Sequence, residues 1–164
     1  MASRELGGGA LLDESHFLDL MVWFFGQPAA ISGSVDHLSS LEITTDDNVD
    51  AIAEYNGFRV TIHLDLYGRP HDRSLTVVGE LGTLQCTFDP NVLRQSGEAA
   101  GDWQTTTFQF ERNDMFVAVA REFLDVINGE KKPACTAGDG IEVLRLVEML
   151  RTSTLERRTV LFQN

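Results

Sequence analysis

The residues with the clearest chemical potential lie close to the N-terminus, where His16 stands between Asp13 and Asp19 at spacings of three residues. In a continuous helix each step of three residues turns the side chain by about −60°, so we expect these three side chains on one flank of about 120°. An imidazole beside carboxylates is held in one tautomer and made more basic, which suits proton transfer to or from a hydroxyl group. Asp13, His16 and Asp19 are therefore the candidate catalytic residues.

Three consecutive glycines, Gly7 to Gly9, precede this segment. Glycines at a helix N-terminus let a ligand approach the backbone and its unpaired N–H groups. They do not form the dinucleotide fingerprint, because Leu12 stands where the third glycine belongs and no strand precedes them. We expect no cofactor site on this chain. A purely structural explanation also stays open, in which Asp13 caps the helix, His16 is a satisfied histidine and Asp19 is solvated.

The remaining histidines and cysteines suggest weaker sites. His63 is expected in mid-strand opposite Asp50, in a structural role, and His71 in a charged turn. No His-x3-His or cysteine pattern supports metal binding around His16. Cys86 and Cys135 are too far apart in sequence to suggest a disulfide framework, and we expect both to be reduced.

Apolar residues at helical spacing predict three helices. The first runs over about 11–25 and ends at Gly26 and Pro28. The second runs over about 114–128, with Asn113 or Asp114 as N-cap and Gly129 after its end, and the third begins near Asp139. The side chains expected to be buried are Phe17, Leu20, Met21 and Phe24 in the first helix; Phe116, Val119, Phe123, Val126 and Ile127 in the second; and Val143, Leu146, Val147 and Leu150 in the third.

Alternating residues on both sides of Asn56-Gly57 predict a β-hairpin with a type I′ turn. The expected cross-strand pairs are Tyr55–Phe58, Ala53–Val60, Ala51–Ile62 and Val49–Leu64 on an apolar face, and Glu54–Arg59 and Asp50–His63 on a polar face. Further strands are expected at about 30–35, 74–79, 83–88, 105–110 and 159–162, and a flexible loop at 94–102.

This order of elements predicts one α+β domain over residues 1–164, with helices packed on one face of an open, mostly antiparallel sheet. The polar face of the hairpin also carries Ile52, Thr61 and Tyr67. The polar face of the hairpin is therefore either exposed to solvent in a monomer or part of an interface.

The charge balance narrows the classes of partner. The chain has 25 acidic and 13 basic residues, a formal net charge of −12. Such a surface repels phosphate backbones and anionic lipids, so we expect neither nucleic acid nor membrane as a partner. No apolar run reaches the length of about 18–20 residues that a bilayer span needs, and the first residues lack a signal-peptide pattern, so we expect a cytoplasmic protein.

An ordered series of motifs resembles the second domain of the glucose–fructose oxidoreductase / inositol dehydrogenase / MocA (Gfo/Idh/MocA) family. The first is the run from Gly7 to Asp19 with Asp13-x-Ser15-His16-x-x-Asp19. The others are Trp23-Phe24-Phe25-Gly26-x-Pro28, Asp46-Asp47-Asn48-Val49, the Asn-Gly hairpin, Val77-Val78-Gly79-Glu80-x-Gly82-Thr83-Leu84, Phe116 to Val126 with Gly129-x-Lys131-x-Pro133, Asp139-Gly140-x-x-Val143-Leu144 and Arg158 to Phe162.

The resemblance implies a two-domain NAD(P)-dependent oxidoreductase that acts on a sugar, sugar derivative or cyclitol hydroxyl. It implies an N-terminal Rossmann domain, absent from this chain, that holds NAD or NADP, and a second domain whose open sheet face forms a homo-oligomer. His16 matches the catalytic histidine, Asp13 is the nearest match for the acidic partner and Asp19 matches the downstream aspartate. Many members have four residues from that aspartate to the histidine, whereas Asp13 to His16 is three.

We therefore expect this chain to supply substrate-binding and acid–base residues but to be inactive alone. A stand-alone domain that binds a small ligand or a protein is the alternative. A metal-dependent hydrolase centred on His16 is the weakest candidate.

Overall fold

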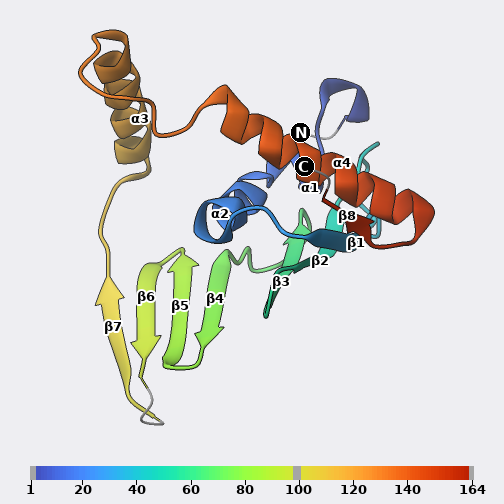
Figure 1. Ribbon diagram of the computed structural model, residues 1–164, viewed down its shortest axis with the longest axis horizontal. Coiled ribbons are helices and arrows are strands. Elements are labelled where there is room, and N and C mark those ends of the chain that lie inside the picture. Colours follow the sequence, from blue (N-terminus) through green and yellow to red (C-terminus); the bar gives the residue numbers. More distant parts are fainter. Residues whose placement is uncertain (1–2, 98–100, 163–164) are drawn as a thin grey trace. The chain divides into compact units, whose positions relative to one another are not determined.

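The computed structural model describes residues 3–97 and 101–162 (Figure 1). The chain divides into two compact units, one formed by Met1–Tyr67 with Ala134–Asn164 and the other by Gly68–Pro133. The expectation of one domain over 1–164 remains a prediction, and we describe each unit by itself.

The first unit contains a four-stranded sheet in the order β3-β2-β1-β8, in which every pair is antiparallel. Its strands are β1 (Ala30–Asp36), β2 (Asn48–Glu54), β3 (Arg59–Asp65) and β8 (Val160–Leu161). The predicted hairpin register is confirmed: Ala53 pairs with Val60, Ala51 with Ile62 and Val49 with Leu64. The prediction of a type I′ turn is wrong. That turn requires a positive φ at both central residues, whereas only Gly57 has one, at 89°.

The helices of this unit are the 3₁₀ helix η1 (Arg4–Leu6), α1 (Ala10–Asp13), α2 (His16–Phe25) and α4 (Ala137–Glu156). The single helix expected at 11–25 is thus two helices separated by a turn at Glu14 and Ser15. The predicted end is confirmed, since Gly26 is the C-cap with φ 74°. Thr136 caps α4, and its hydroxyl accepts the N–H of Asp139.

The core of the first unit has two sides. Helices α1, α2 and α4 form one side, and the inward side chains of β1, β2 and β3 form the other. The apolar face predicted for the third helix is confirmed: Leu146 and Leu150 are fully buried in α4. In the helix predicted at 11–25 the stripe is only partly buried, since Met21 is 4% exposed but Phe24 is 50% exposed. The buried hydrophobic residues are Ala10, Leu11, Leu18, Met21, Ala30, Ile31, Val49, Ala51, Ala53, Leu64, Val143, Leu146, Val147 and Leu150.

The second unit contains the antiparallel sheet β4-β5-β6-β7 and one helix. Its elements are β4 (Ser74–Gly79), β5 (Gly82–Phe88), β6 (Asn91–Ser96), β7 (Trp103–Thr107) and α3 (Arg112–Ile127). The loop expected at 94–102 is partly wrong, because β6 includes residues 94–96; residues 98–100 lie outside the described part.

Helix α3 departs from its prediction in two ways. Glu111 is its N-cap and forms a capping box with Asp114, in place of Asn113 or Asp114 as cap. The stripe expected to be buried is not: Phe116, Val119 and Phe123 are each at least 60% exposed, and α3 has no buried residue in this structure.

The α+β class with antiparallel strands is confirmed, and the strands form two sheets. Cys86 and Cys135 are free cysteines, as expected. Among the described residues, no helix has the length and hydropathy required to cross a bilayer.

Candidate functional site

The three candidate catalytic residues lie on both sides of the turn between α1 and α2. Asp13 is the last residue of α1, and its Oδ2 accepts the N–H of Gly9 at 3.3 Å. His16 is the first residue of α2, with 58% of its side chain exposed, and Asp19 is exposed in the first turn of the same helix. The helical spacing therefore relates His16 to Asp19 but not to Asp13, because the helix is interrupted between Asp13 and His16.

The carboxylate that the structure places beside His16 is that of Glu14. Its Oε2 lies 3.3 Å from His16 Nε2, and the Glu14 side chain is only 16% exposed. The imidazole ring of His16 also contacts the ring of Phe17, with the centroids 4.5 Å apart and the planes tilted by 37°. Sequence reasoning missed Glu14 because it assumed a continuous helix. Ser15 could have indicated the break, since serine often precedes the first residue of a helix.

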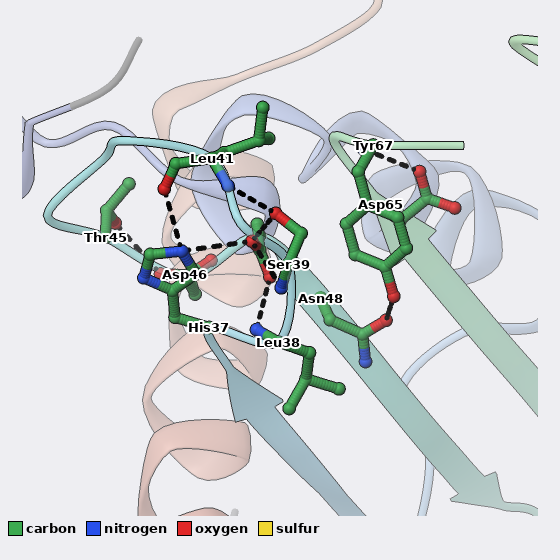
Figure 2. Close-up of polar contacts among 10 residues, drawn as sticks. His37, Leu38, Ser39, Leu41, Thr45, Asp46, Asn48, Asp65 and Tyr67 are labelled. Atoms are coloured by element: carbon green, nitrogen blue, oxygen red, sulfur yellow. Dashed lines mark hydrogen bonds and ion pairs between the residues drawn. The ribbon is translucent and has the colours of Figure 1, made fainter. Parts of the chain in front are cut away.

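The glycine segment is held by the chain itself. The backbone carbonyl of Asp46 accepts the N–H of Ala10 at 3.0 Å, and its Oδ2 accepts the N–H of Leu11 at 2.8 Å. The Thr45 hydroxyl donates to the carbonyl of Gly8 at 2.7 Å. The expectation of unpaired N–H groups is thus wrong at these positions. Figure 2 shows Thr45 and Asp46 in the loop that precedes β2.

Gly9 shows how tight this contact is. Its φ is 125°, and an added Cβ would lie 2.4 Å from Thr45 Oγ1 and 2.6 Å from Asp46 Oδ1. A side chain at residue 9 would therefore strain the backbone and displace both polar groups. The glycine here permits close packing of two segments of one chain.

Asp47, the next residue, is a fully buried carboxylate that fixes the loop at 37–41. Figure 2 shows His37, Leu38, Ser39 and Leu41 of this loop. Asp47 accepts hydrogen bonds from the Leu38 N–H, the Ser39 N–H and the Ser39 hydroxyl, and His37 Nε2 lies 3.3 Å away. Burial raises the pKa of Asp47, but the bonds from Ser39 and Leu38 and the nearby His37 outweigh it, so its pKa lies below the ordinary 3.8.

A second polar cluster lies on the face of the first sheet that points away from the core, which we call the outer face. His63 Nδ1 lies 2.7 Å from Asp50 Oδ1, and His63 Nε2 lies 3.2 Å from Asp65 Oδ2. Asn48 donates to Asp50 at 2.7 Å and accepts from the Tyr67 hydroxyl at 2.8 Å. Figure 2 shows Asn48, Asp65 and Tyr67 side by side. We name Asn48, Asp50, His63, Asp65 and Tyr67 the outer-face cluster.

The hydrogen bond to Asp50 raises the pKa of His63 above 6.5 against the opposing effect of burial, and Asp65 adds to the increase. The bonds from His63 and Asn48 hold the pKa of Asp50 below 3.8. Both directions favour the ion pair. The predicted pairing of Asp50 with His63 is therefore confirmed, and the participation of Asp65, Asn48 and Tyr67 was not predicted.

The outer-face cluster borders a shallow groove with a volume of about 440 Å³. The groove crosses β1, β2 and β3. Its lining residues include the hydroxyl-bearing Ser32, Ser34 and Thr61 and the apolar Ile52. Within the described residues, no group of three or more His, Cys, Asp and Glu side chains is arranged to hold a metal ion.

The family of the chain follows from its first half. Residues 1–85 match the profile of the GFO/IDH/MocA C-terminal domain. The chain belongs to the Gfo/Idh/MocA family. The matched residues include the glycine segment, both helices around His16 and the first sheet as far as β3.

Solved structures share the fold of this Gfo/Idh/MocA chain at low sequence identity. Levoglucosan dehydrogenase in complex with NADH has a TM-score of 0.84 at 15% identity, and the match covers 96% of this chain and 51% of that one. The WlbA dehydrogenase from Bordetella pertussis, in complex with NADH and UDP-GlcNAcA, has a TM-score of 0.72 at 20% identity, with 96% and 46% coverage. The chain thus spans about half the length of these structures. No curated protein matches the sequence.

Proposed function

We propose that this chain is the substrate-side domain of an NAD(P)-dependent oxidoreductase that acts on a hydroxyl group of a sugar, sugar derivative or cyclitol. The observation that carries the proposal is the family match over residues 1–85, which contains α1, the turn at Glu14 and Ser15, and α2 with His16 as its first residue. The two dehydrogenases with the same fold support it, since their structures contain NADH, and one of them is also known in complex with levoglucosan.

His16 is the proposed proton carrier. Its imidazole is more than half exposed at the start of α2, so a substrate hydroxyl can reach it. Removal of a hydride from a carbon that bears a hydroxyl requires loss of the hydroxyl proton, and His16 accepts that proton. Glu14, 3.3 Å from Nε2, stabilises the imidazolium that results. Asp19 lies one helical turn further on, and its proposed role is to bind a neighbouring hydroxyl.

Asp13 acts more indirectly in this proposal. Its carboxylate accepts the Gly9 N–H and so holds α1 in place before the turn that carries Glu14. It positions the turn, whereas Glu14 lies beside the imidazole.

We propose that the glycine segment of this chain does not hold the nicotinamide cofactor. The N–H groups of Ala10 and Leu11 are bound by Asp46, and the space at Gly9 is filled by Thr45 and Asp46. A separate nucleotide-binding domain must supply the hydride acceptor, so we propose that these residues alone have no dehydrogenase activity. We also propose a cytoplasmic protein that self-associates through the outer face.

The test requires the reading frame together with its upstream sequence. A protein that includes an in-frame Rossmann domain should reduce NAD or NADP with at least one member of a panel of sugars and cyclitols. His16→Ala should lower kcat by about 100-fold or more, as expected for loss of an acid–base group. Glu14→Gln should lower kcat less, while Asp102→Asn, in the second unit, serves as the control.

Two outcomes contradict the proposal at different levels. Unchanged turnover in His16→Ala would remove His16 from the role of proton carrier. A stop codon and ribosome-binding site directly upstream, with no nucleotide-binding domain, would favour the stand-alone binding domain instead.

A further inference from the structure

Helix α1 begins at a residue that has no side chain to cap it. Gly9 stands at the N-cap position, where helices usually carry Ser, Thr, Asp or Asn. Asp46, in the loop before β2, supplies the missing acceptors. Its backbone carbonyl accepts the N–H of Ala10 at 3.0 Å, and its Oδ2 accepts the N–H of Leu11 at 2.8 Å. Asp46 therefore caps α1 from a position 35 residues beyond Leu11.

Thr45 binds the same loop to the glycine segment. Its hydroxyl donates to the Gly8 carbonyl at 2.7 Å and lies 3.1 Å from Asp46 Oδ1. Thr45 itself is buried, and β2 begins two residues after Asp46, between β1 and β3 in the sheet. The start of α1 is thus anchored to a central strand of the first sheet.

A short path of hydrogen bonds leads from Asp46 to the turn beside His16. Helix α1 has only four residues, and the Glu14 N–H donates to the Ala10 carbonyl at 3.1 Å. Ala10 is thus bound to Asp46 through its N–H and to Glu14 through its carbonyl. The Glu14 carbonyl in turn accepts the N–H of Phe17, in the first turn of α2, at 3.0 Å. A shift at the start of α1 therefore moves the turn that places Glu14 3.3 Å from His16.

We infer that Asp46 is a positioning residue for the proton carrier His16 and its partner Glu14. The inference rests on the proposed function and adds a residue to its site. The Asp46 carboxylate is bound to the backbone of α1, so it acts through the turn and not on the substrate. Proton transfer is sensitive to such placement, since a displacement on the order of 1 Å can lower a rate by about 100-fold.

Steady-state kinetics of the protein that includes its nucleotide-binding domain test this role. Asp46→Ala removes the acceptor of the Leu11 N–H and should lower kcat by about tenfold or more. KM should change by less than about threefold, because a misplaced acid–base group affects the chemical step more than substrate binding. Asp46→Asn keeps an oxygen that can accept the Leu11 N–H, so its kcat should stay within about threefold of that of the unchanged protein.

The coupling to Glu14 is the result that a merely structural role would not give. In Glu14→Gln the turn no longer places a carboxylate beside His16, so the addition of Asp46→Ala should lower kcat by less than about threefold further. Asp47→Asn is the matched control. The carboxylate of Asp47 binds the loop at 37–41, so its loss should destabilise the first unit and leave kcat unchanged.

Thr45→Val removes the hydrogen bond to Gly8 with a side chain of the same shape, so it carries the test if Asp46→Ala does not fold. It should lower kcat several-fold in the presence of Glu14 and have little effect in Glu14→Gln.

The outcomes separate the inference from the proposed function. Unchanged kcat in Asp46→Ala, or in Thr45→Val where that variant carries the test, overturns the positioning role. Equal losses of kcat with and without Glu14 overturn it as well. In both cases the proposed function stands if His16→Ala still lowers kcat. Unchanged kcat in His16→Ala removes the proton carrier, and the inference then falls together with the proposed function.

Discussion

Helices α3 and α4 carry similar apolar stripes and bury them to very different extents. In α4, Val143, Leu146, Val147 and Leu150 are each at most 7% exposed. In α3, Phe116, Val119, Phe123 and Ile127 are each at least 60% exposed. The same contrast holds for the two units, because every buried hydrophobic residue of the described chain lies in the first unit.

The difference shows that an apolar stripe predicts which side chains a helix is able to bury. It does not predict whether another element covers them. Helix α4 contacts β1, and its Ser153 hydroxyl accepts the Gly33 N–H at 3.0 Å. Burial requires such a facing element. The amphipathic pattern of α3 predicts an apolar face. The sequence of the helix alone does not predict which element packs against that face.

The largest expected effect compares three leucines. Leu146→Ala in α4 should lower the free energy of unfolding by about 3 kcal/mol, because it leaves a cavity in the core. Leu144→Ala in the same helix and Leu124→Ala in α3 remove side chains that are 54% and 57% exposed. Both should cost about 0.5 kcal/mol or less in urea unfolding. A loss of several kcal/mol for Leu124→Ala would show that α3 is covered in solution.

The next effect concerns the buried carboxylate of the first unit. Asp47→Asn should cost about 2 kcal/mol at neutral pH, because the ionised group accepts several hydrogen bonds. Its pKa is lowered from 3.8, so its contribution is present above that value and is lost as the pH falls through the folded pKa. Unfolding midpoints of the protein and of the variant should therefore converge in acid. Asp102→Asn, exposed in the second unit, should change little at any pH.

A smaller effect separates two glycines that both have positive φ. Gly129→Ala, at φ 77° with nothing near the added Cβ, should cost only about 1 kcal/mol, the ordinary backbone penalty. Gly9→Ala adds the contacts with Thr45 and Asp46, so it should cost about 1 kcal/mol more. Thermal unfolding of the two variants measures the difference. Equal losses of stability would mean that the loop before β2 moves to accommodate the added methyl group at almost no cost in free energy.

The smallest effect is the stability that His63 contributes. The pKa of His63 is raised above 6.5, so its contribution is complete below that pH and is lost as the pH rises through the folded value. At 56% exposure, solvent screens the pair, and His63→Gln should cost less than about 1 kcal/mol at about pH 6 and nothing at about pH 9. Measurements at low protein concentration keep the comparison free of dimer. A pH-independent difference would contradict the pairing with Asp50 and Asp65.

Local patterns predicted the parts of the fold that depend on neighbouring residues. The pairing of β2 with β3 and the contact of Asp50 with His63 follow from Asn56-Gly57 and the alternation around it. The apolar face of α4 follows in the same way from its period. The α+β class could be predicted because it requires only the order of such elements.

The candidate site depends on contacts that no local pattern contains. Helix α1, which ends before the break at Glu14 and Ser15, begins with N–H groups that Asp46 binds, and Asp46 is 35 residues from Leu11. A continuous helix was the simplest interpretation of residues 11–25, and it placed Asp13 instead of Glu14 beside His16. Likewise, Tyr67 joins the outer-face cluster only through the bend that follows β3.

The composition of the first unit from two distant segments has a consequence for biosynthesis. Strand β1 pairs with β2 and with β8, and Ser153 bridges the Gly33 N–H and the Arg158 carbonyl. The ribosome therefore releases the first three strands of this sheet before it makes the helix that covers them. At a translation rate of roughly 5–20 residues per second, α4 is synthesised several seconds after β1. The apolar side of β1 is therefore uncovered during that time. During that interval the nascent chain exposes apolar surface of the kind that makes partly folded chains prone to aggregation.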